Sequence, residues 1–249
     1  MNSNRDKVAL ILAAGKGKRM KSDIPKVLHR LDGKYIVDHV IENARRAGIE
    51  KQILVIGHKA GMVREAMADR NVHFALQEEQ LGTGHAVMMA REHLTGFSGD
   101  LVVLCGDMPL VREDTIRKLL EERRRLDAAA VVLTVVLDDP KRYGRIVRDE
   151  KGLLQAIVEY RDADEKIREI KEVNTGAFCF DWQKLDGILD KLSDKNSQKE
   201  YYLTDSVDLF VSRGDTVGAL IASDPYEGFG INSVEELSLV ESLIKNGTK

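Results

Sequence analysis

The chain has 249 residues, of which 43% are hydrophobic and 32% charged, and its formal net charge is -3. This balance is typical of a folded globular protein and argues against a disordered chain or a basic nucleic-acid-binding surface. No apolar run is long enough to span a bilayer, and the polar start from Met1 to Lys7 shows no signal peptide. We therefore expect neither nucleic acid nor a membrane as a partner. Cys105 and Cys179 lie in apolar runs without metal-ligand spacing, which predicts buried thiols in a reducing, cytoplasmic setting.

Apolar strands alternate with helical patterns through the first half of the chain. The expected strands are 8–13, 52–56, 73–76, 101–105 and 129–136, and the expected helices are 35–47, 61–68, 113–126 and one from the turn at 82–84 to 93. This alternation predicts an α/β fold with a Rossmann-like, doubly wound, mixed but mostly parallel sheet. Right-handed crossovers then bring the carboxyl ends of the strands to one edge, where ligands bind.

The second half of the chain does not continue the regular alternation of strands and helices. Its expected elements are hairpin strands 144–148 and 153–159, a strand at 173–180, helices 182–192 and 202–211, a strand at 216–221 and a terminal helix at 234–244. No linker, low-complexity tract or internal repeat interrupts the sequence. We expect one domain over 1–249, in which about 6–137 form one half, about 138–232 add strands and a lid over the same edge, and 233–249 form the C-terminal helix.

A basic, glycine-rich stretch follows the first strand. Between positions 16 and 26 it contains one acid, Asp23, and five cations, which are Lys16, Lys18, Arg19, Lys21 and Lys26. Gly15 and Gly17 allow a tight turn with N–H groups facing a ligand, and the fixed cations favour a polyanion such as a nucleoside triphosphate. The alternative is a solvated basic loop. The spacing excludes the Walker pattern, and Met20 stands where the dinucleotide fingerprint has its third glycine.

Three further groups of polar residues could carry chemistry. Asp107 directly follows a buried strand and offers a hard oxygen ligand for Mg²⁺ beside phosphates, although a turn aspartate before Pro109 has the same pattern. The Gln77 amide suits the edge of a pyrimidine, although its segment also fits a helix start with Thr83 as the cap. The third group sets a glycine, Gly144, and two polar side chains, Glu159 and Asn174, among apolar residues. The two polar side chains suit sugar hydroxyls and amides, or else a satisfied core network.

In their order along the chain, these motifs resemble those of the sugar-nucleotide pyrophosphorylases. The resemblance is to the uridylyltransferase domain of bacterial bifunctional N-acetylglucosamine-1-phosphate uridylyltransferases, and it extends from Val8 to about Leu243. It is carried by L-A-A-G-x-G-x-R-M…P-K, Q-x-G-T-G-H-A, G-D-x-P-L, Y-G-R-I-V-R, E-V-N-T-G, E-Y-Y-L-T-D and G-I-N-S.

The resemblance implies a nucleotide-diphospho-sugar transferase fold, with a nucleotide-binding half at 6–137 and a sugar-binding half at 138–232. It implies UTP and N-acetylglucosamine 1-phosphate as substrates and Mg²⁺ as the cofactor. The implied site residues are Arg19 and Lys26 for catalysis; Leu12, Ala14, Gly15, Gln77, Gly82 and Thr83 for the nucleotide; Gly144, Glu159 and Asn174 for the sugar; and Asp107 and Asn232 for the metal. Asn232 by itself also fits a helix N-cap.

The chain departs from the bifunctional members of that family in one respect. It stops at Lys249 without the hexapeptide repeats of the left-handed β-helix that carries acetyl transfer in those proteins. We therefore expect a stand-alone pyrophosphorylase or a piece of a longer protein, and a monomer or dimer rather than the family's trimer. Another sugar phosphate or dTTP as substrate, and a non-catalytic sugar-nucleotide sensor, remain open alternatives.

Overall fold

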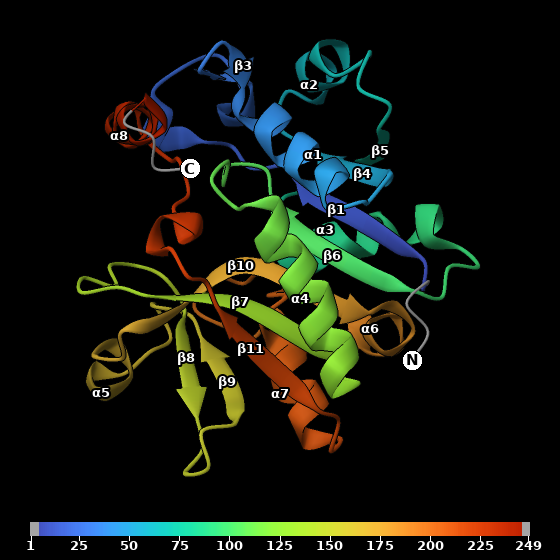
Figure 1. The fold of residues 1–249 in the computed structure, drawn as a ribbon, viewed down its shortest axis with the longest axis vertical. Helices are drawn as coiled ribbons and strands as arrows, with labels where there is room; N and C mark the ends of the chain where they lie inside the picture. The colour runs from blue at the N-terminus through green and yellow to red at the C-terminus, as the bar shows by residue number, and fades with distance from the viewer. Residues whose placement is uncertain (1–4, 246–249) are drawn as a thin grey trace.

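A computed structural model describes residues 5–245 and shows one continuous nine-stranded sheet (Figure 1). Seven strands follow the order β11-β7-β10-β6-β1-β4-β5, while β8 pairs with β10 and with β9. The strands are β1 (Lys7–Leu12), β4 (Lys51–Ile56), β5 (His73–Leu76), β6 (Asp100–Cys105), β7 (Ala130–Val136), β8 (Arg145–Arg148), β9 (Leu154–Val158), β10 (Glu172–Asp181) and β11 (Val217–Ile221). Because β10 runs antiparallel to both β6 and β7, the sheet is mixed but mostly parallel, as the sequence predicts.

Helices cover both faces of the sheet. They are α1 (Ile36–Arg46), α2 (Ala60–Ala66), α3 (Thr83–Met89), α4 (Glu113–Leu126), α5 (Glu165–Arg168), α6 (Trp182–Leu189), α7 (Asp205–Ser212) and α8 (Val234–Lys245). Short 3₁₀ turns add η1 (Lys18–Met20), η2 (Lys26–Leu28), η3 (Arg91–Leu94) and η4 (Pro225–Gly228). The expected terminal helix is found up to Lys245, and positions 246–249 lie outside the described residues. Within residues 5–245, the helices are too short or too polar to cross a membrane.

The period-two pattern of the strands divides the core between the two faces. In β1, Val8 and Leu10 pack with α3, α6 and α7, whereas Ala9 and Ile11 pack with α1, α2 and α4. Figure 1 shows α1 and α4 in front of the sheet and α3, α6 and α7 behind it. At about 25 cal/mol for each Å² of apolar surface removed from water, these two layers supply most of the stabilisation. They hold the strand ends in fixed positions.

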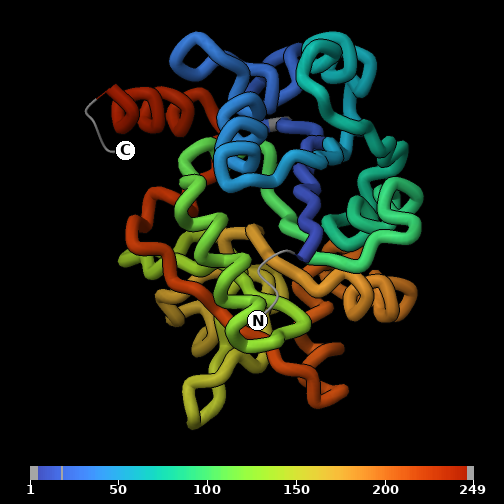
Figure 2. Tube along the Cα trace, turned by 45° about the vertical axis from the view of Figure 1, so that its right-hand side comes forward, coloured from blue at the N-terminus to red at the C-terminus, as the bar shows by residue number. Residues whose placement is uncertain are grey.

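A small hairpin after the first loop was not predicted. Strands β2 (Arg30–Leu31) and β3 (Lys34–Tyr35) flank the turn Asp32-Gly33, where both residues have positive φ. This is the Asp-Gly signature of a tight hairpin, in strands of only two residues. The hairpin packs near the C-terminal helix. Leu31 of β2 and Ile36 at the start of α1 form a core cluster with Ile231 and with Val240 of α8. Figure 2 shows α8 beside this early segment of the chain.

Candidate active site

The loops after β1 and β6 lie side by side at one edge of the sheet. The two strands are parallel neighbours in which Leu12 pairs with Cys105, and the Gly106 N–H donates to the Leu12 carbonyl at 2.9 Å. The glycine-rich loop after Leu12 and the Asp107 turn therefore leave the sheet at adjacent positions. Asp107 thus lies beside the first loop at the carboxyl ends of these strands.

A cavity of about 520 Å³ opens at this edge. That volume lies within the range of small-molecule binding sites. The predicted residues that line it are Leu12, Ala14, Gly15, Lys26, Gln77, Gly82, Thr83 and Asp107. The structure thus gathers all six residues predicted for the nucleotide around one cavity, together with Lys26 and Asp107.

Lys26 joins the two residues predicted to hold the metal. Its ammonium donates to Asp107 Oδ2 and, at 2.8 Å, to Asn232 Oδ1. Lys26 begins η2, directly after Pro25, and a Cβ on Gly17 would lie only 2.8 Å from the Lys26 Cβ. Gly17, with φ +55°, therefore permits the close approach of the loop to Lys26. Three side chains from remote parts of the sequence meet at one point.

The Asp107 and Asn232 oxygens suit a hard divalent cation. One is a carboxylate and the other an amide oxygen, and in this structure both accept hydrogen bonds from a positively charged ammonium group. Among residues 5–245, no cluster of three or more histidine, cysteine or acidic side chains could hold a metal ion. Two hard oxygen donors, from Asp107 and Asn232, fit Mg²⁺, which keeps several waters and takes phosphate oxygens alongside one or two protein ligands.

Gln77 is held in one orientation on the floor of the cavity. Its Nε2 donates to the Gly82 carbonyl at 3.0 Å and lies 3.1 Å from Nδ1 of His85. Only 3% of the residue is exposed. Because Nε2 faces the Gly82 carbonyl and the His85 ring, the amide oxygen is the group left for a ligand. His85 thus helps to fix the position of the Gln77 amide.

Gly82 and Gly84 allow the segment around Tyr201 to cross the start of α3. A Cβ on Gly82 would lie 2.5 Å from the Tyr201 carbonyl oxygen, and Gly84 N–H donates to the same oxygen at 2.8 Å. The Thr83 hydroxyl accepts from the Leu203 N–H at 3.0 Å. The N-cap of α3 is Gly82, so the alternative of Thr83 as the cap is wrong. The motif E-Y-Y-L-T-D is therefore part of the cavity wall.

The three residues predicted for the sugar lie together but do not line this cavity. Asn174 N–H donates to the Gly144 carbonyl at 2.9 Å, and a Cβ on Gly144 would lie 3.4 Å from Glu159 Oε1. The Asn174 side chain accepts from the Gly176 N–H at 2.8 Å, at an irregularity in the pairing of β10 with β7. Thr204 Oγ1 donates to Glu159 Oε1 at 3.3 Å. Part of this group is therefore engaged in a protein network.

Arg19 is the predicted catalytic residue that the structure does not bring to the cavity. It lies exposed on η1 and is absent from the cavity lining. Among the lining residues that were not assigned a site role from the sequence are Gln80, Cys105 and Glu200. Cys105 was predicted to be buried but is half-buried, because the cavity opens beside it at the end of β6. The E-Y-Y-L-T-D motif contains Glu200 and could have indicated it.

Carboxylates gather behind the Glu159 network. Burial, together with the negative charges of Asp208, Glu159 and Asp162, raises the pKa of Asp205 from its ordinary value of 3.8 to about 6. Burial also raises the pKa of Glu159, against the effect of the hydrogen bond from Thr204. Protons therefore bind more tightly to these groups in the folded chain than in the unfolded chain.

Asp205→Asn is expected to remove a pH-dependent loss of stability. A carboxyl whose pKa is raised by folding contributes stability below about pH 3.8, and that contribution is lost as the pH rises through about 6. The melting temperature of the variant, relative to that of the wild type, should therefore rise as the pH increases from 4 to 7. Thermal melts across this range measure the difference, and a constant difference would contradict the shifted pKa of Asp205.

The fold and the site are those of a nucleotidyltransferase, and comparison with known families agrees. The model of the MobA-like NTP transferase domain matches residues 9–174. This chain belongs to the family of proteins with a MobA-like NTP transferase domain.

Individual relatives refine this assignment. The chain is 45% identical over 240 residues to the bifunctional protein GlmU of Clostridium botulinum (strain Eklund 17B / Type B), which covers 96% of this chain and 52% of that protein. It is 44% identical over 237 residues to the bifunctional protein GlmU of Clostridioides difficile (strain 630), covering 95% of this chain and 51% of that protein. The chain thus spans about half the length of these curated relatives.

A solved structure shows the same fold. The crystal structure of UDP-glucose pyrophosphorylase complexed with UDP-glucose has a TM-score of 0.76 and covers 97% of this chain and 99% of that chain. At 19% sequence identity, this likeness shows the fold alone. It confirms the predicted nucleotide-diphospho-sugar transferase fold.

Proposed function

We propose that this protein transfers UMP from UTP to N-acetylglucosamine 1-phosphate, giving UDP-N-acetylglucosamine and pyrophosphate. The observation that carries the proposal is the Lys26 ammonium bridging Asp107 and Asn232 beside a nucleotide-sized cavity. The resemblance to GlmU proteins supports the choice of uridylyl transfer and of an N-acetylated sugar. The product would serve as a precursor for peptidoglycan and the cell wall.

The proposed chemistry needs charge neutralisation and alignment rather than a base. The attacking group is a phosphate oxygen of the sugar phosphate, which is already ionised at neutral pH; it forms a bond to the α-phosphorus as the bond to pyrophosphate breaks. Lys26 turns from Asp107 and Asn232 to the phosphates and stabilises the charge that develops there. Asp107 and Asn232 would hold Mg²⁺, which would supply Lewis-acid charge neutralisation. Arg19 would reach the triphosphate only by movement of its exposed turn.

Base selection follows from the fixed Gln77 amide. With its Nε2 hydrogens directed at Gly82 and His85, the amide oxygen accepts a hydrogen bond from a base that carries a ring N–H at its edge. Uracil and thymine carry that donor, whereas cytosine presents a bare ring nitrogen at the same position. We therefore propose UTP as the nucleotide, with dTTP as the alternative that the same contact admits.

Sugar selection is assigned to Gly144, Glu159 and Asn174. The Glu159 carboxylate and the Asn174 amide offer acceptors and donors for sugar hydroxyls and the acetamido group. Gly144 leaves room between them, since a Cβ there would meet Glu159 at 3.4 Å. Glucose 1-phosphate or another sugar phosphate is the alternative within the class. A non-catalytic sensor is disfavoured because a binder needs no ammonium shared between two metal-type ligands.

A pyrophosphate-release panel across sugar 1-phosphates and nucleotides tests the proposal. We expect the highest kcat/KM with UTP and N-acetylglucosamine 1-phosphate, and a large loss with CTP. Higher activity with glucose 1-phosphate would contradict the roles of Glu159 and Asn174. No release with any pair would favour the sensor.

The proposal includes the setting of the enzyme. Free thiols at Cys105 and Cys179 support a reducing, cytoplasmic location. The proposed partners are the small-molecule substrates alone, and we propose a monomer or dimer for the residues described.

A further inference from the structure

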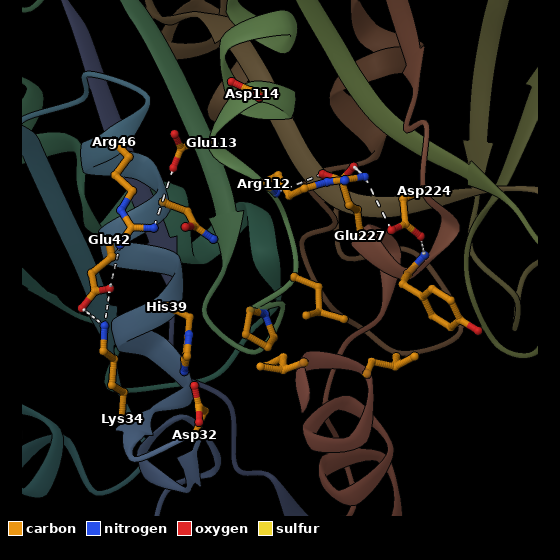
Figure 3. A pocket seen from close by; sticks show the side chains of 16 residues that line it. Asp32, Lys34, His39, Glu42, Arg46, Arg112, Glu113, Asp114, Asp224 and Glu227 are labelled. Atoms are coloured by element: carbon orange, nitrogen blue, oxygen red, sulfur yellow. Dashed lines mark hydrogen bonds and ion pairs between the residues drawn. The ribbon is translucent and has the colours of Figure 1, made fainter. Parts of the chain in front are cut away.

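The segments that carry Asp107 and Asn232 are joined, outside the cavity, by an ion pair between a part-exposed arginine and a buried carboxylate. Arg112 follows Asp107 by a few residues and precedes α4, while Glu227 lies in η4 shortly before Asn232. The Arg112 backbone N–H donates to Glu227 Oε2 at 2.9 Å, and Arg112 Nη2 donates to Glu227 Oε1 at 3.0 Å. Figure 3 shows this Arg112–Glu227 pair, with Asp224 beside it, on one wall of a second cavity of about 510 Å³.

Removal of either partner of the Arg112–Glu227 pair is expected to be destabilising. Glu227 is 1% exposed, and a buried carboxylate is tolerated only when charge and hydrogen bonds compensate its desolvation. Its carboxylate also lies at the start of α4, where the helix dipole favours a negative charge. Asp224 holds Arg112 from a second side at 3.5 Å. Without Arg112, η4 would have to shift or admit water to solvate Glu227.

A second contact links the same two segments next to the metal ligands. Ile231 N–H donates to the Asp107 carbonyl at 2.9 Å, and the Ile231 side chain is fully buried. On the sheet side, a Cβ on Gly228 would lie 2.7 Å from Val135 Cγ2, so η4 packs directly on β7. The segment from η4 to Asn232 is therefore fixed by the sheet, by the Asp107 turn and by the Arg112–Glu227 pair.

We propose that the Arg112–Glu227 pair is a positioning device that sets the separation of Asp107 and Asn232 and thereby the affinity of their metal site. The inference rests on the proposed function, because it takes these two residues as the metal ligands. Neither Arg112 nor Glu227 lines the cavity proposed for the nucleotide. They act by holding two oxygen donors, far apart in the sequence, at the separation that Mg²⁺ requires.

A second ion pair between a part-exposed arginine and a buried carboxylate provides a matched control. Asp38 is 3% exposed, accepts from Arg70 at 2.8 and 3.2 Å, and accepts from the Tyr35 N–H at 3.1 Å. Like Glu227, it is a buried carboxylate held by an arginine side chain and a backbone N–H. It ties α1 to the turn after α2 rather than the Asp107 turn to η4. Arg70→Met therefore reproduces the loss of stability without the positioning effect.

The test is direct measurement of Mn²⁺ binding by electron paramagnetic resonance of the free ion. Wild type and variants are titrated with UDP-N-acetylglucosamine present throughout, and a protein-free titration is subtracted. We expect Arg112→Met to raise the half-saturating Mn²⁺ concentration about 10- to 100-fold, as for other residues that orient metal ligands. Glu227→Gln, which keeps one acceptor for the Arg112 N–H, should show a smaller rise and serves if Arg112→Met does not fold. Arg70→Met should leave the Mn²⁺ constant unchanged.

Asp107→Ala separates failure of this inference from failure of the proposed function. If wild type binds no Mn²⁺, or if Asp107→Ala binds it as wild type does, the proposed metal site is wrong and the positioning role falls with it. If Asp107→Ala loses Mn²⁺ while both Arg112→Met and Glu227→Gln retain the wild-type constant, only the positioning role is overturned. An equal rise in Arg70→Met would also overturn it, because a general loss of stability would then explain the effect.

Discussion

Lys26→Ala is expected to lower kcat by about 10²- to 10³-fold, as for the loss of one preorganised donor at a charged transition state. The fold should persist, since the Lys26 and Asp107 side chains are 13% and 20% exposed and Asp107 can be solvated from the cavity. Nucleotide binding should weaken much less, because the Gln77 contacts do not involve Lys26. Steady-state kinetics and a thermal melt measure these effects together.

Lys16→Ala is the matched control for that change. Lys16 also lines the cavity, but it is exposed on the glycine-rich loop, so we expect it to steer the substrate rather than act on it. We expect a modest fall in kcat/KM that shrinks as salt is added, with kcat nearly unchanged. Near-normal turnover of Lys26→Ala, or an equal loss of kcat in Lys16→Ala, would remove the proposed role of Lys26.

Asp107→Ala is the second change with a large expected effect. It removes one of the two protein oxygens proposed to hold Mg²⁺ and frees the Lys26 ammonium from its carboxylate partner. We expect the Mg²⁺ concentration for half-maximal rate to rise at least about 100-fold, since loss of even an outer-shell partner costs 10- to 100-fold. Initial rates across a Mg²⁺ series at fixed free UTP provide the measurement.

Asp107→Asn controls for the charge alone. The amide keeps an oxygen ligand and the shape of the side chain, so its dependence on Mg²⁺ should lie between those of wild type and Asp107→Ala. A wild-type dependence on Mg²⁺ in Asp107→Ala would show that Asp107 is a turn residue before Pro109.

Much of the fold could be predicted because its signals are local. The first four core strands and α4 follow from apolar runs and caps, and α4 spans Glu113–Leu126 as predicted. The place of β10 could not be predicted, because its insertion between β6 and β7 depends on long-range pairing. The two-residue strands β2 and β3 are too short to show a period, although their Asp-Gly turn was visible.

The site was predictable where residues directly follow buried strands. Leu12 and Asp107 satisfy that condition, and parallel pairing then places their loops together. The contact between Lys26 and Asn232 spans almost the whole chain, so spacing alone could not reveal it. The Arg112–Glu227 pair gives no sequence signal, since each residue reads as an ordinary surface charge. Its significance appears only when the 1% exposure of Glu227 is known.

The most direct measurement of the central claim is the fate of label in the reaction of UTP with N-acetylglucosamine 1-phosphate. With UTP labelled at the α-phosphorus, we expect the label in UDP-N-acetylglucosamine; with label at the γ-phosphorus, we expect it in pyrophosphate. Recovery of the α-label as free UMP, or as unreacted UTP in the presence of both substrates and Mg²⁺, would contradict uridylyl transfer by this protein.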